Sequence, residues 1–243
     1  FHPQFLLGMS ATPERNDQFD IYKMFHYNIA YEIRLQQAME YDLLCPFHYY
    51  GITDLNIDGI SIDDKSDFNL LINEKRIDYI IEKIEEYGYS GEKVHGLIFV
   101  SRKQEAIELS NLFNQRGYNT IALTGDDNEE KRQEAMDRLE SNDEDGLDYI
   151  FTVDIFNEGI DIPKVNQVVM LRPTQSAIIF VQQLGRGLRK NDEKDYVVVI
   201  DFIGNYERNF LIPIALSGNT NLNKDTLRQF ITERNALIPG VST

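Results

Sequence analysis

The sequence predicts an α/β fold in which a central parallel sheet is flanked by helices. Past residue 90, short β-branched runs alternate with amphipathic segments, the pattern of successive βαβ units. The strand-like runs are almost continuously apolar, which suits strands covered on both faces. The composition, 42% hydrophobic and 26% charged over 243 residues, is that of an ordinary globular chain long enough to bury a sizeable core.

Each element follows from a local pattern. Apolar, β-branched runs predict strands, and apolar residues at helical spacing predict helices. The expected strands span residues 94–100, 120–123, 149–153, 167–171 and 196–201, and the expected helices span residues 103–116, 129–139 and 176–184. Upstream, Ile77, Ile80, Ile81 and Ile84 recur at i, i+3, i+4 and i+7, which predicts an amphipathic helix over residues 74–87.

The two ends of the chain carry weaker patterns. Towards the N-terminus we expect a helix near residues 33–44, a strand at 46–55 and a loop or linker over the polar residues 58–67. Towards the C-terminus, residues 226–233 have a weak helical pattern.

Charge is distributed unevenly along the chain. The net charge of −16 argues against binding polyanions over the whole surface. Residues 126–148 hold eleven acids and three bases, whereas residues 172–190 hold four bases and no acid. The basic stretch is therefore the first place to look for an anion site.

Several classes of protein are disfavoured. Cys45 is the single cysteine, so no internal disulfide forms, and the four histidines lack metal-ligand spacing. No apolar run approaches the roughly 18 residues of a membrane span. A reducing cytoplasmic location fits best. The chain starts at Phe1 without an initiator methionine or leader, so we expect it to be part of a longer protein.

The basic stretch has the chemistry of a polyphosphate site. If its helix continues, Gln182, Arg186 and Arg189 share one stripe. Guanidinium groups donate bidentate hydrogen bonds to phosphate and stay charged. The alternative is a solvated basic helix face, but Gly185 and Gly187 weigh against it, because each costs about 1 kcal/mol in a helix interior.

A second candidate site follows the strand at 149–153. Asp154, Gly159 and Asp161 lie where open α/β sheets bind ligands, beyond the carboxyl end of a strand. A carboxylate there is suited to accept hydrogen bonds from ribose hydroxyls. The alternative is a simple turn, with Gly159 supplying an unusual backbone angle and Pro163 ending the loop.

Two further strand ends carry polar residues. Ser101 with Gln104 matches a capping box, which favours a structural role for Ser101, while Arg102 and Lys103 can reach a phosphate backbone. After the next strand, Thr124 and Gly125 offer a hydroxyl and a backbone amide at the same edge of the sheet.

Phosphate-loop and metal signals are missing from the sequence. No Gly-x-x-x-x-Gly-Lys-Ser/Thr segment occurs, so these residues lack the usual cradle for a β-phosphate and the hydroxyl for magnesium. The acidic run at residues 192–195 precedes its strand, which predicts a surface turn and not a magnesium site. We expect no metal site in this chain.

Taken together, these segments resemble superfamily 2 helicases and translocases, specifically their second RecA-like domain. Residues 7–15 resemble the Ser-Ala-Thr segment that closes the first RecA-like domain, and residues 172–205 look most like DEAD/DEAH-type helicases akin to the motor subunits of type I and III restriction enzymes. The resemblance implies the end of a first RecA-like domain at 1–15, an inter-domain linker or subregion at 16–73, a second RecA-like domain at 74–205 and the start of a C-terminal module at 206–243.

The resemblance also implies roles for individual residues. Arg186 and Arg189 would be arginine fingers that reach the γ-phosphate of ATP, with Gln182 positioning them. Gly159 and Asp161 would lie near the ATP sugar and couple the two domains. Nucleic-acid backbone contacts would come from Ser101, Arg102, Thr124, Gly125, Thr152 and Asp154, and inter-domain coupling from Ser10, Ala11 and Thr12.

Two positions depart from the family pattern. Gln183 stands where many relatives carry Arg, and Val153 stands where some carry Thr. The second departure leaves Thr152 as the substitute for that backbone contact.

The expected function is the C-terminal motor domain of an ATP-dependent helicase or translocase. ATP with Mg²⁺ would be bound mainly by an upstream RecA-like domain, so this part should be nearly inactive alone. DNA is favoured over RNA as the partner, and no membrane is involved. The alternative is a non-catalytic regulatory or scaffold module, against which the arginine pair speaks. A dinucleotide enzyme would need a Gly-x-Gly-x-x-Gly segment, which the sequence lacks.

Overall fold

The computed structural model describes most of the central part of the chain. The described residues are 4–9, 20–33, 35–53, 55–57, 60–61, 66–153, 162–172, 185, 188–202 and 241–242. The helices expected at 176–184 and 226–233 lie outside these ranges.

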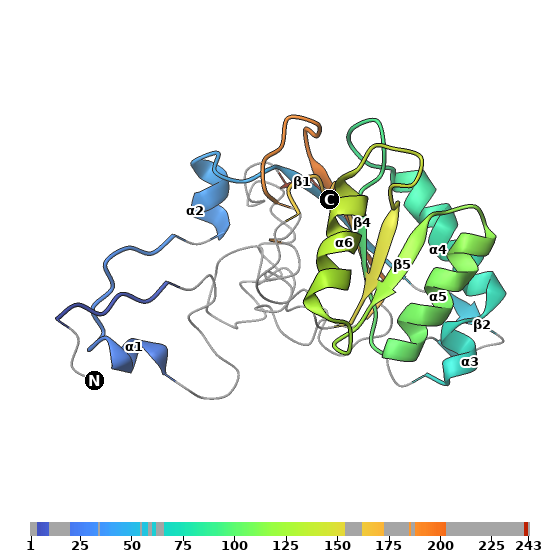
Figure 1. Cartoon of the computed structure of the whole chain (residues 1–243), viewed down its shortest axis with the longest axis horizontal. Coiled ribbons are helices and arrows are strands. Elements are labelled where there is room, and N and C mark those ends of the chain that lie inside the picture. The colour runs from blue at the N-terminus through green and yellow to red at the C-terminus, as the bar shows by residue number, and fades with distance from the viewer. Residues whose placement is uncertain are drawn as a thin grey trace, which may run out of the picture.

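Seven strands of the described residues form one sheet, in the order β5-β6-β4-β7-β8-β1-β9 (Figure 1). Every neighbouring pair in it runs parallel, as the sequence predicts. The strands are β1 (Phe47–Ile52), β4 (Gly96–Phe99), β5 (Thr120–Leu123), β6 (Tyr149–Thr152), β7 (Gln167–Met170), β8 (Val197–Phe202) and β9 (Val241–Ser242). The five strands expected past residue 90 are therefore confirmed, with ends that shift by one or two residues.

Helices cover both faces of the sheet and make three layers. Helices α4 (Glu74–Tyr87) and α5 (Lys103–Gln115) lie on one face, and α6 (Glu129–Glu140) lies on the other (Figure 1). The strands alternate to serve both faces. Leu97 and Phe99 of β4 pack in the cluster that includes α6, whereas Ile98 packs in the cluster that includes α4 and α5. Double coverage explains why these strands read as continuous apolar runs.

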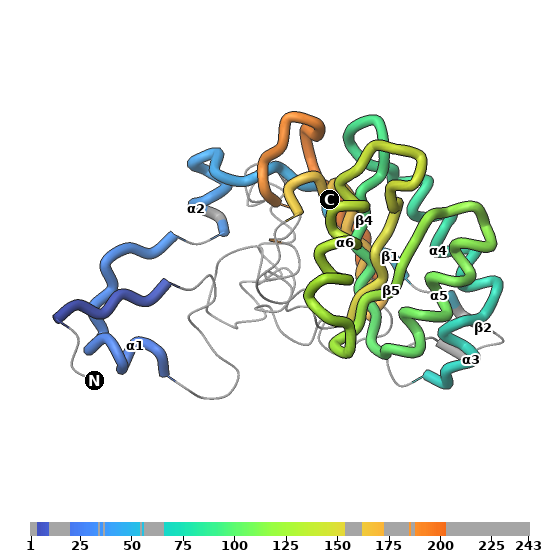
Figure 2. The backbone as a smooth tube through the Cα atoms, in the orientation of Figure 1, coloured from blue at the N-terminus to red at the C-terminus, as the bar shows by residue number. Residues whose placement is uncertain are grey.

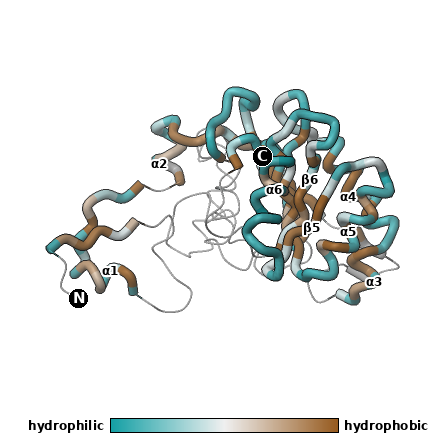
Figure 3. Tube along the Cα trace, viewed as in Figure 1, coloured by the Kyte–Doolittle hydropathy of each residue, from teal (hydrophilic) through white to brown (hydrophobic). Residues whose placement is uncertain are grey.

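The hydropathy of each helix follows its position. Figure 3 shows brown, apolar strands inside the layers and a largely teal α6 on the outside. In α6, only Ala135, Met136 and Leu139 are buried. The acid-rich stretch at 126–148 is therefore the solvated face of α6 and its following turn, as its composition indicates.

Side chains and a glycine set the helix ends. The Asn73 side chain accepts the Lys75 N–H at 3.0 Å at the start of α4, and Gly88, with φ 63°, follows its end. At α6, Asn128 accepts the Lys131 N–H at 2.9 Å. These signals explain why the predicted bounds of α4 match the structure.

The expected capping box at Ser101 and Gln104 is wrong. Arg102 occupies the N-cap of α5 and makes no side-chain cap hydrogen bond. The Glu105 carboxylate instead accepts the Ser101 N–H at 3.2 Å. The helix begins one residue later than a Ser101 cap requires, which brings Glu105, and not Gln104, to the position that reaches back.

The N-terminal part contains the helix expected near residues 33–44, as α2 (Leu35–Glu40), and the strand expected at 46–55, as β1. Strand β1 pairs with β8, so the sheet begins earlier in the chain than the predicted domain boundary at residue 74. Residues 60–61, expected in a loop, form β3 (Ile60–Ser61), which pairs antiparallel with β2 (Asn56–Ile57). The missed signal is Asp58-Gly59, a pair favoured between hairpin strands.

Among the described residues, three short helices precede α4: α1 (Ile21–Met24), α2 (Leu35–Glu40) and α3 (Phe68–Leu71). Figure 2 shows residues 4–9 and α1 lying apart from the sheet. Large apolar side chains are exposed there, with Phe5 at 92% and Met9 at 91%. Exposed apolar side chains of this size are suited to contact another apolar surface.

Candidate functional site

The carboxyl ends of three neighbouring strands form the centre of the candidate site. Thr152 at the end of β6 is in register with Phe99 of β4 on one side and with Leu123 of β5 on the other. The residues that follow β4 and β5, Ser101 and Thr124, therefore come to the same edge of the sheet as Thr152. The parallel topology thus brings together three of the predicted nucleic-acid contacts, which are 23 to 51 residues apart in the sequence.

A buried carboxylate holds the loop after β4. Glu105 is 1% exposed, accepts the Ser101 N–H, and lies 3.7 Å from the Arg76 guanidinium, which is equally buried. Burial raises the pKa of Glu105, while Arg76 and the N–H groups of Ser101 and Arg102 oppose the rise. Because these amides are committed to Glu105, the loop presents its side chains to a ligand.

The upstream segment also anchors this loop. The Arg102 guanidinium donates to the Ser66 carbonyl at 3.1 Å, and Arg76 donates to the Leu71 carbonyl at 2.9 Å. Both arginines therefore tie the end of β4 and the start of α5 to residues 66–71. Arg102 is half-buried in this arrangement.

The loop after β5 is closed by its own acids. The Asp127 carboxylate accepts the Thr124 N–H at 2.7 Å and the Thr124 hydroxyl at 3.3 Å, and the Thr124 hydroxyl in turn accepts the Asp126 N–H at 3.3 Å. Burial works against ionisation of Asp127, but Lys131 and the Thr124 N–H hold its pKa below the ordinary value. Thr124 is 7% exposed, and its hydroxyl makes hydrogen bonds within the turn.

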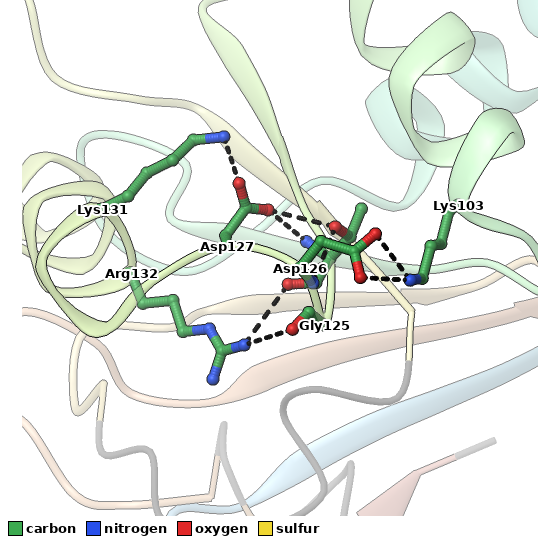
Figure 4. A network of polar contacts seen from close by, with 7 residues as sticks. Lys103, Gly125, Asp126, Asp127, Lys131 and Arg132 are labelled. Carbon is green, nitrogen blue, oxygen red and sulfur yellow. Dashed lines mark hydrogen bonds and ion pairs between the residues drawn. The ribbon is translucent and has the colours of Figure 1, made fainter.

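Three bases surround this loop from two helices (Figure 4). From α5, Lys103 Nζ lies 2.7 Å from both carboxylate oxygens of Asp126. From α6, Lys131 pairs with Asp127, and Arg132 donates to the Gly125 carbonyl at 3.2 Å and to the Thr124 carbonyl at 3.4 Å. Each base is thus engaged by an acid or a carbonyl group of this loop, so the positive charges of Lys103 and Lys131 are offset by Asp126 and Asp127.

Thr152 is enclosed at the centre of the edge. It is 0% exposed, and its hydroxyl oxygen has no hydrogen-bond partner among the described residues. A buried hydroxyl in this state is costly, which makes Thr152 unusual within the sheet.

Comparison with known proteins identifies the fold and the family of the domain that contains this edge. Residues 75–191 match the family model described as the helicase conserved C-terminal domain. The chain carries a helicase C-terminal domain. IRC3 of Saccharomyces cerevisiae, described as an ATP-dependent helicase, is 30% identical over 208 residues, which are 82% of this chain and 29% of IRC3.

Other relatives agree with this assignment. The ATP-dependent RNA helicase DeaD of Buchnera aphidicola is 26% identical over 167 residues, covering 68% of this chain and 26% of DeaD. The chain therefore spans less than a third of either relative.

Solved structures show the same fold at low identity. A fragment described as the HsdR subunit of a type I restriction enzyme from Vibrio vulnificus aligns with a TM-score of 0.57 at 20% identity, over 79% of this chain and 38% of that one. The restriction-modification enzyme LlaBIII aligns with a TM-score of 0.52 at 20% identity, over 82% of this chain and 14% of that one. The RecA-like, three-layer fold expected from the sequence is confirmed.

The predicted ATP-facing stripe of the helicase C-terminal domain is described only at its end. Arg189 is exposed, whereas the preceding Leu188 is fully buried, and its carbonyl accepts the Cys45 N–H at 2.7 Å. Lys190 forms an ion pair with Asp42 at 2.6 Å. Leu188 thus packs inward, and Arg189 lies at the surface.

Several predicted residues lie outside the described ranges. They are Ser10, Ala11 and Thr12 at the N-terminus, Asp154, Gly159 and Asp161 after β6, and Gln182 and Arg186 in the basic stretch. Their roles stay predictions.

Sequence reasoning missed a buried acid near the carboxyl end of β8, two strands from β4. Asp201 of β8 is 2% exposed and accepts a hydrogen bond from the Tyr49 hydroxyl of β1 at 2.8 Å. Burial raises the pKa of Asp201 to about 7, and the Tyr49 hydrogen bond opposes that rise. The available signal was an acid inside an otherwise apolar strand, but its partner lies 152 residues away.

Within the described ranges, no group of three or more His, Cys, Asp or Glu side chains is arranged to hold a metal ion. No helix in the same ranges is long and apolar enough to cross a membrane.

Proposed function

We propose that this chain is the C-terminal motor domain of an ATP-dependent nucleic-acid helicase or translocase, with DNA as the favoured partner. The observation that carries the proposal is the convergence of Ser101, Thr124 and Thr152 at one edge of the sheet, next to Arg102 and Lys103. Hydroxyls, an exposed glycine amide at Gly125 and basic side chains are the groups that contact a phosphodiester backbone without reading its sequence.

The nucleic-acid track would run along this edge. Ser101, Arg102 and Gly125 would contact the backbone, with Asp154 completing the set. Thr124 and Thr152 are 7% and 0% exposed, so they would make their contacts only once the loops at this edge open. Because the chain carries a net charge of −16, binding depends on this local set of donors and should weaken steeply as salt is added.

The preference for DNA rests on the sequence of residues 172–205, which resembles the motor subunits of type I and III restriction enzymes. The solved structure of LlaBIII is a complex with DNA, whereas DeaD is named as an RNA helicase. A test of the preference therefore has to compare both nucleic acids.

ATP hydrolysis would need a second domain. ATP with Mg²⁺ would be held mainly by an upstream RecA-like domain, and Arg186 and Arg189 would reach its γ-phosphate when the domains close. An arginine finger is worth roughly 10³ to 10⁵ in rate, or about 4 to 7 kcal/mol of barrier. Closure only when ATP and nucleic acid are both bound would convert hydrolysis into stepping.

The remaining predicted residues would support that closure. Gln182 would position the two arginines, and Gly159 and Asp161 would lie near the ATP sugar. Ser10, Ala11 and Thr12 would couple the first domain to this one.

Steady-state ATP hydrolysis by the longer protein tests the proposal. Turnover is measured without nucleic acid, with duplex DNA and with RNA, for wild type, Arg189→Ala and the control Arg138→Ala. Arg138 lies on α6 and donates to the Asp145 carbonyl, away from the site. We expect DNA-stimulated turnover that falls by about 10³ or more in Arg189→Ala and is unchanged in Arg138→Ala. Absence of stimulation, or an Arg189→Ala variant as fast as wild type, would favour a scaffold role instead.

A further inference from the structure

One ion pair at the candidate edge has the geometry of a phosphate contact. The ammonium of Lys103 lies 2.7 Å from each of the two carboxylate oxygens of Asp126 (Figure 4). A backbone phosphate, like this carboxylate, can present two oxygens of one anion to a single ammonium group. The pair bridges the start of α5 and the loop between β5 and α6.

The pair adjoins the predicted track on both sides. Lys103 follows Arg102 in the chain, and Asp126 follows Gly125. Both side chains face solvent, with Lys103 52% and Asp126 77% exposed. An exposed pair of this kind favours the closed contact by no more than about fivefold, so a phosphate at Gly125 can displace it.

The Asp126 carboxylate has no other task in the described part of the chain. It contacts only Lys103 there, whereas the neighbouring Asp127 carboxylate caps Thr124 and is 15% exposed. Arg132 is committed to the carbonyls of Thr124 and Gly125. Of the acids and bases around the loop, Asp126 and Lys103 are therefore the pair that can separate without undoing the turn.

We propose that Lys103 is a further ligand of the nucleic-acid backbone and that Asp126 occupies, in the absence of nucleic acid, the place of a phosphate. This inference rests on the proposed function, because it adds a residue to the same track. On binding, the phosphate takes the ammonium of Lys103, and the Asp126 carboxylate turns to solvent. Asp126 thus weakens binding by competition, which limits the affinity of this edge for nucleic acid.

The test is binding of fluorescent single-stranded oligonucleotides by the full chain, followed by anisotropy at several salt concentrations. Oligothymidylate and oligouridylate serve as the DNA and RNA probes. The variants are Asp126→Asn, Lys103→Met, the double variant, and the control Glu129→Gln. Glu129 is an exposed acid three residues away in the first turn of α6, so its substitution removes the same charge without freeing Lys103. Thermal unfolding of each variant confirms that it folds.

We expect Asp126→Asn to bind about threefold to fivefold more tightly than Glu129→Gln does, and this excess to vanish in the Lys103→Met background. Lys103→Met alone should lower the slope of log K against log salt by about 0.7, the loss of one phosphate contact on a single strand. A gain on both probes identifies the shared phosphodiester as the ligand, and a gain on one probe assigns the contact to that nucleic acid.

The opposite results separate two failures. Equal affinities of Asp126→Asn and Glu129→Gln, or an excess that persists in Lys103→Met, overturn the competition between Asp126 and phosphate. An unchanged salt slope in Lys103→Met overturns the role of Lys103 as a ligand. If wild type and all variants fail to bind either probe at low salt, the proposed nucleic-acid function itself is refuted.

Discussion

Replacing Thr152 by valine should stabilise the protein and weaken the candidate site. The Thr152 hydroxyl is fully buried in β6 between Phe99 and Leu123 and has no hydrogen-bond partner among the described residues. Valine has nearly the same shape and is equally suited to a strand, so Thr152→Val removes the desolvated hydroxyl without opening a cavity.

The size of the effect follows from the cost of an unpaired polar group. A buried donor or acceptor without a partner costs about 1 to 3 kcal/mol. Since valine recovers part of this cost, we expect the free energy of unfolding to rise by about 1 to 2 kcal/mol. In a protein of this size each kcal/mol corresponds to a rise in Tm of about 2 to 4 °C.

A matched control lies on the adjacent strand. Thr120 of β5 is also buried, but its hydroxyl is hydrogen-bonded to the Ser110 hydroxyl at 2.8 Å and to the Ser110 carbonyl and the Asn114 side chain, each at 3.0 Å. Thr120→Val removes the partner of the buried Ser110 hydroxyl and should lower the free energy of unfolding by about 1 to 3 kcal/mol. The two substitutions are chemically identical and should have opposite signs.

Urea unfolding followed by circular dichroism measures both variants, and oligonucleotide binding measures the functional cost. We expect Thr152→Val to be more stable than wild type and to bind nucleic acid more weakly, a stability–function trade-off. A Thr152→Val variant destabilised as much as Thr120→Val would refute the reasoning, because it would show that the Thr152 hydroxyl is satisfied in the folded protein.

Two further predictions concern stability. Native Asp201 keeps its proton up to about pH 7, whereas the unfolded chain releases it near 3.8, so stability falls between these values as pH rises, by about 1.4 kcal/mol per pH unit from this group. Asp201→Asn should remove this part of the pH dependence of the free energy of unfolding. Urea unfolding at acidic and at mildly alkaline pH measures that dependence, and parallel pH profiles of variant and wild type would contradict the prediction. Phe113→Ala removes a fully buried ring 5.0 Å from that of Phe151 and should cost about 3 to 5 kcal/mol, whereas Ile107→Ala, 41% exposed on the same helix, should cost far less; similar losses in urea unfolding would contradict this packing.

The sequence predicted the elements whose signals are local. The spacing of the isoleucines in α4 predicts its buried face, and the apolar runs predict β5 and β6. Asn73 and Gly88 mark where α4 begins and ends. The strand ends predicted the place of the candidate site for the same reason, because parallel strands separated by helices must point the same way.

The details of the site depended on contacts that no local pattern contains. Ser101 was expected to cap α5, yet a buried carboxylate, Glu105, performs the reciprocal half of that role and is held in turn by Arg76 from another helix. The proposed competition between Asp126 and phosphate for Lys103 likewise requires α5 to lie next to the β5–α6 loop. Lys103 and Asp126 are 23 residues apart in the sequence.

By itself, then, the sequence determined the fold class, the position of most helices and strands past residue 74, and the edge of the sheet where polar residues gather. These features follow from periodicity and turn chemistry, which act over a few residues. Only the tertiary structure decided that β1 joins the sheet beside β8, that Tyr49 meets Asp201, and that the Thr152 hydroxyl is enclosed with no hydrogen-bond partner among the described residues. Strand order and burial depend on packing between segments that are distant in the sequence. The free energy of that packing cannot be recognised in any single stretch of the chain.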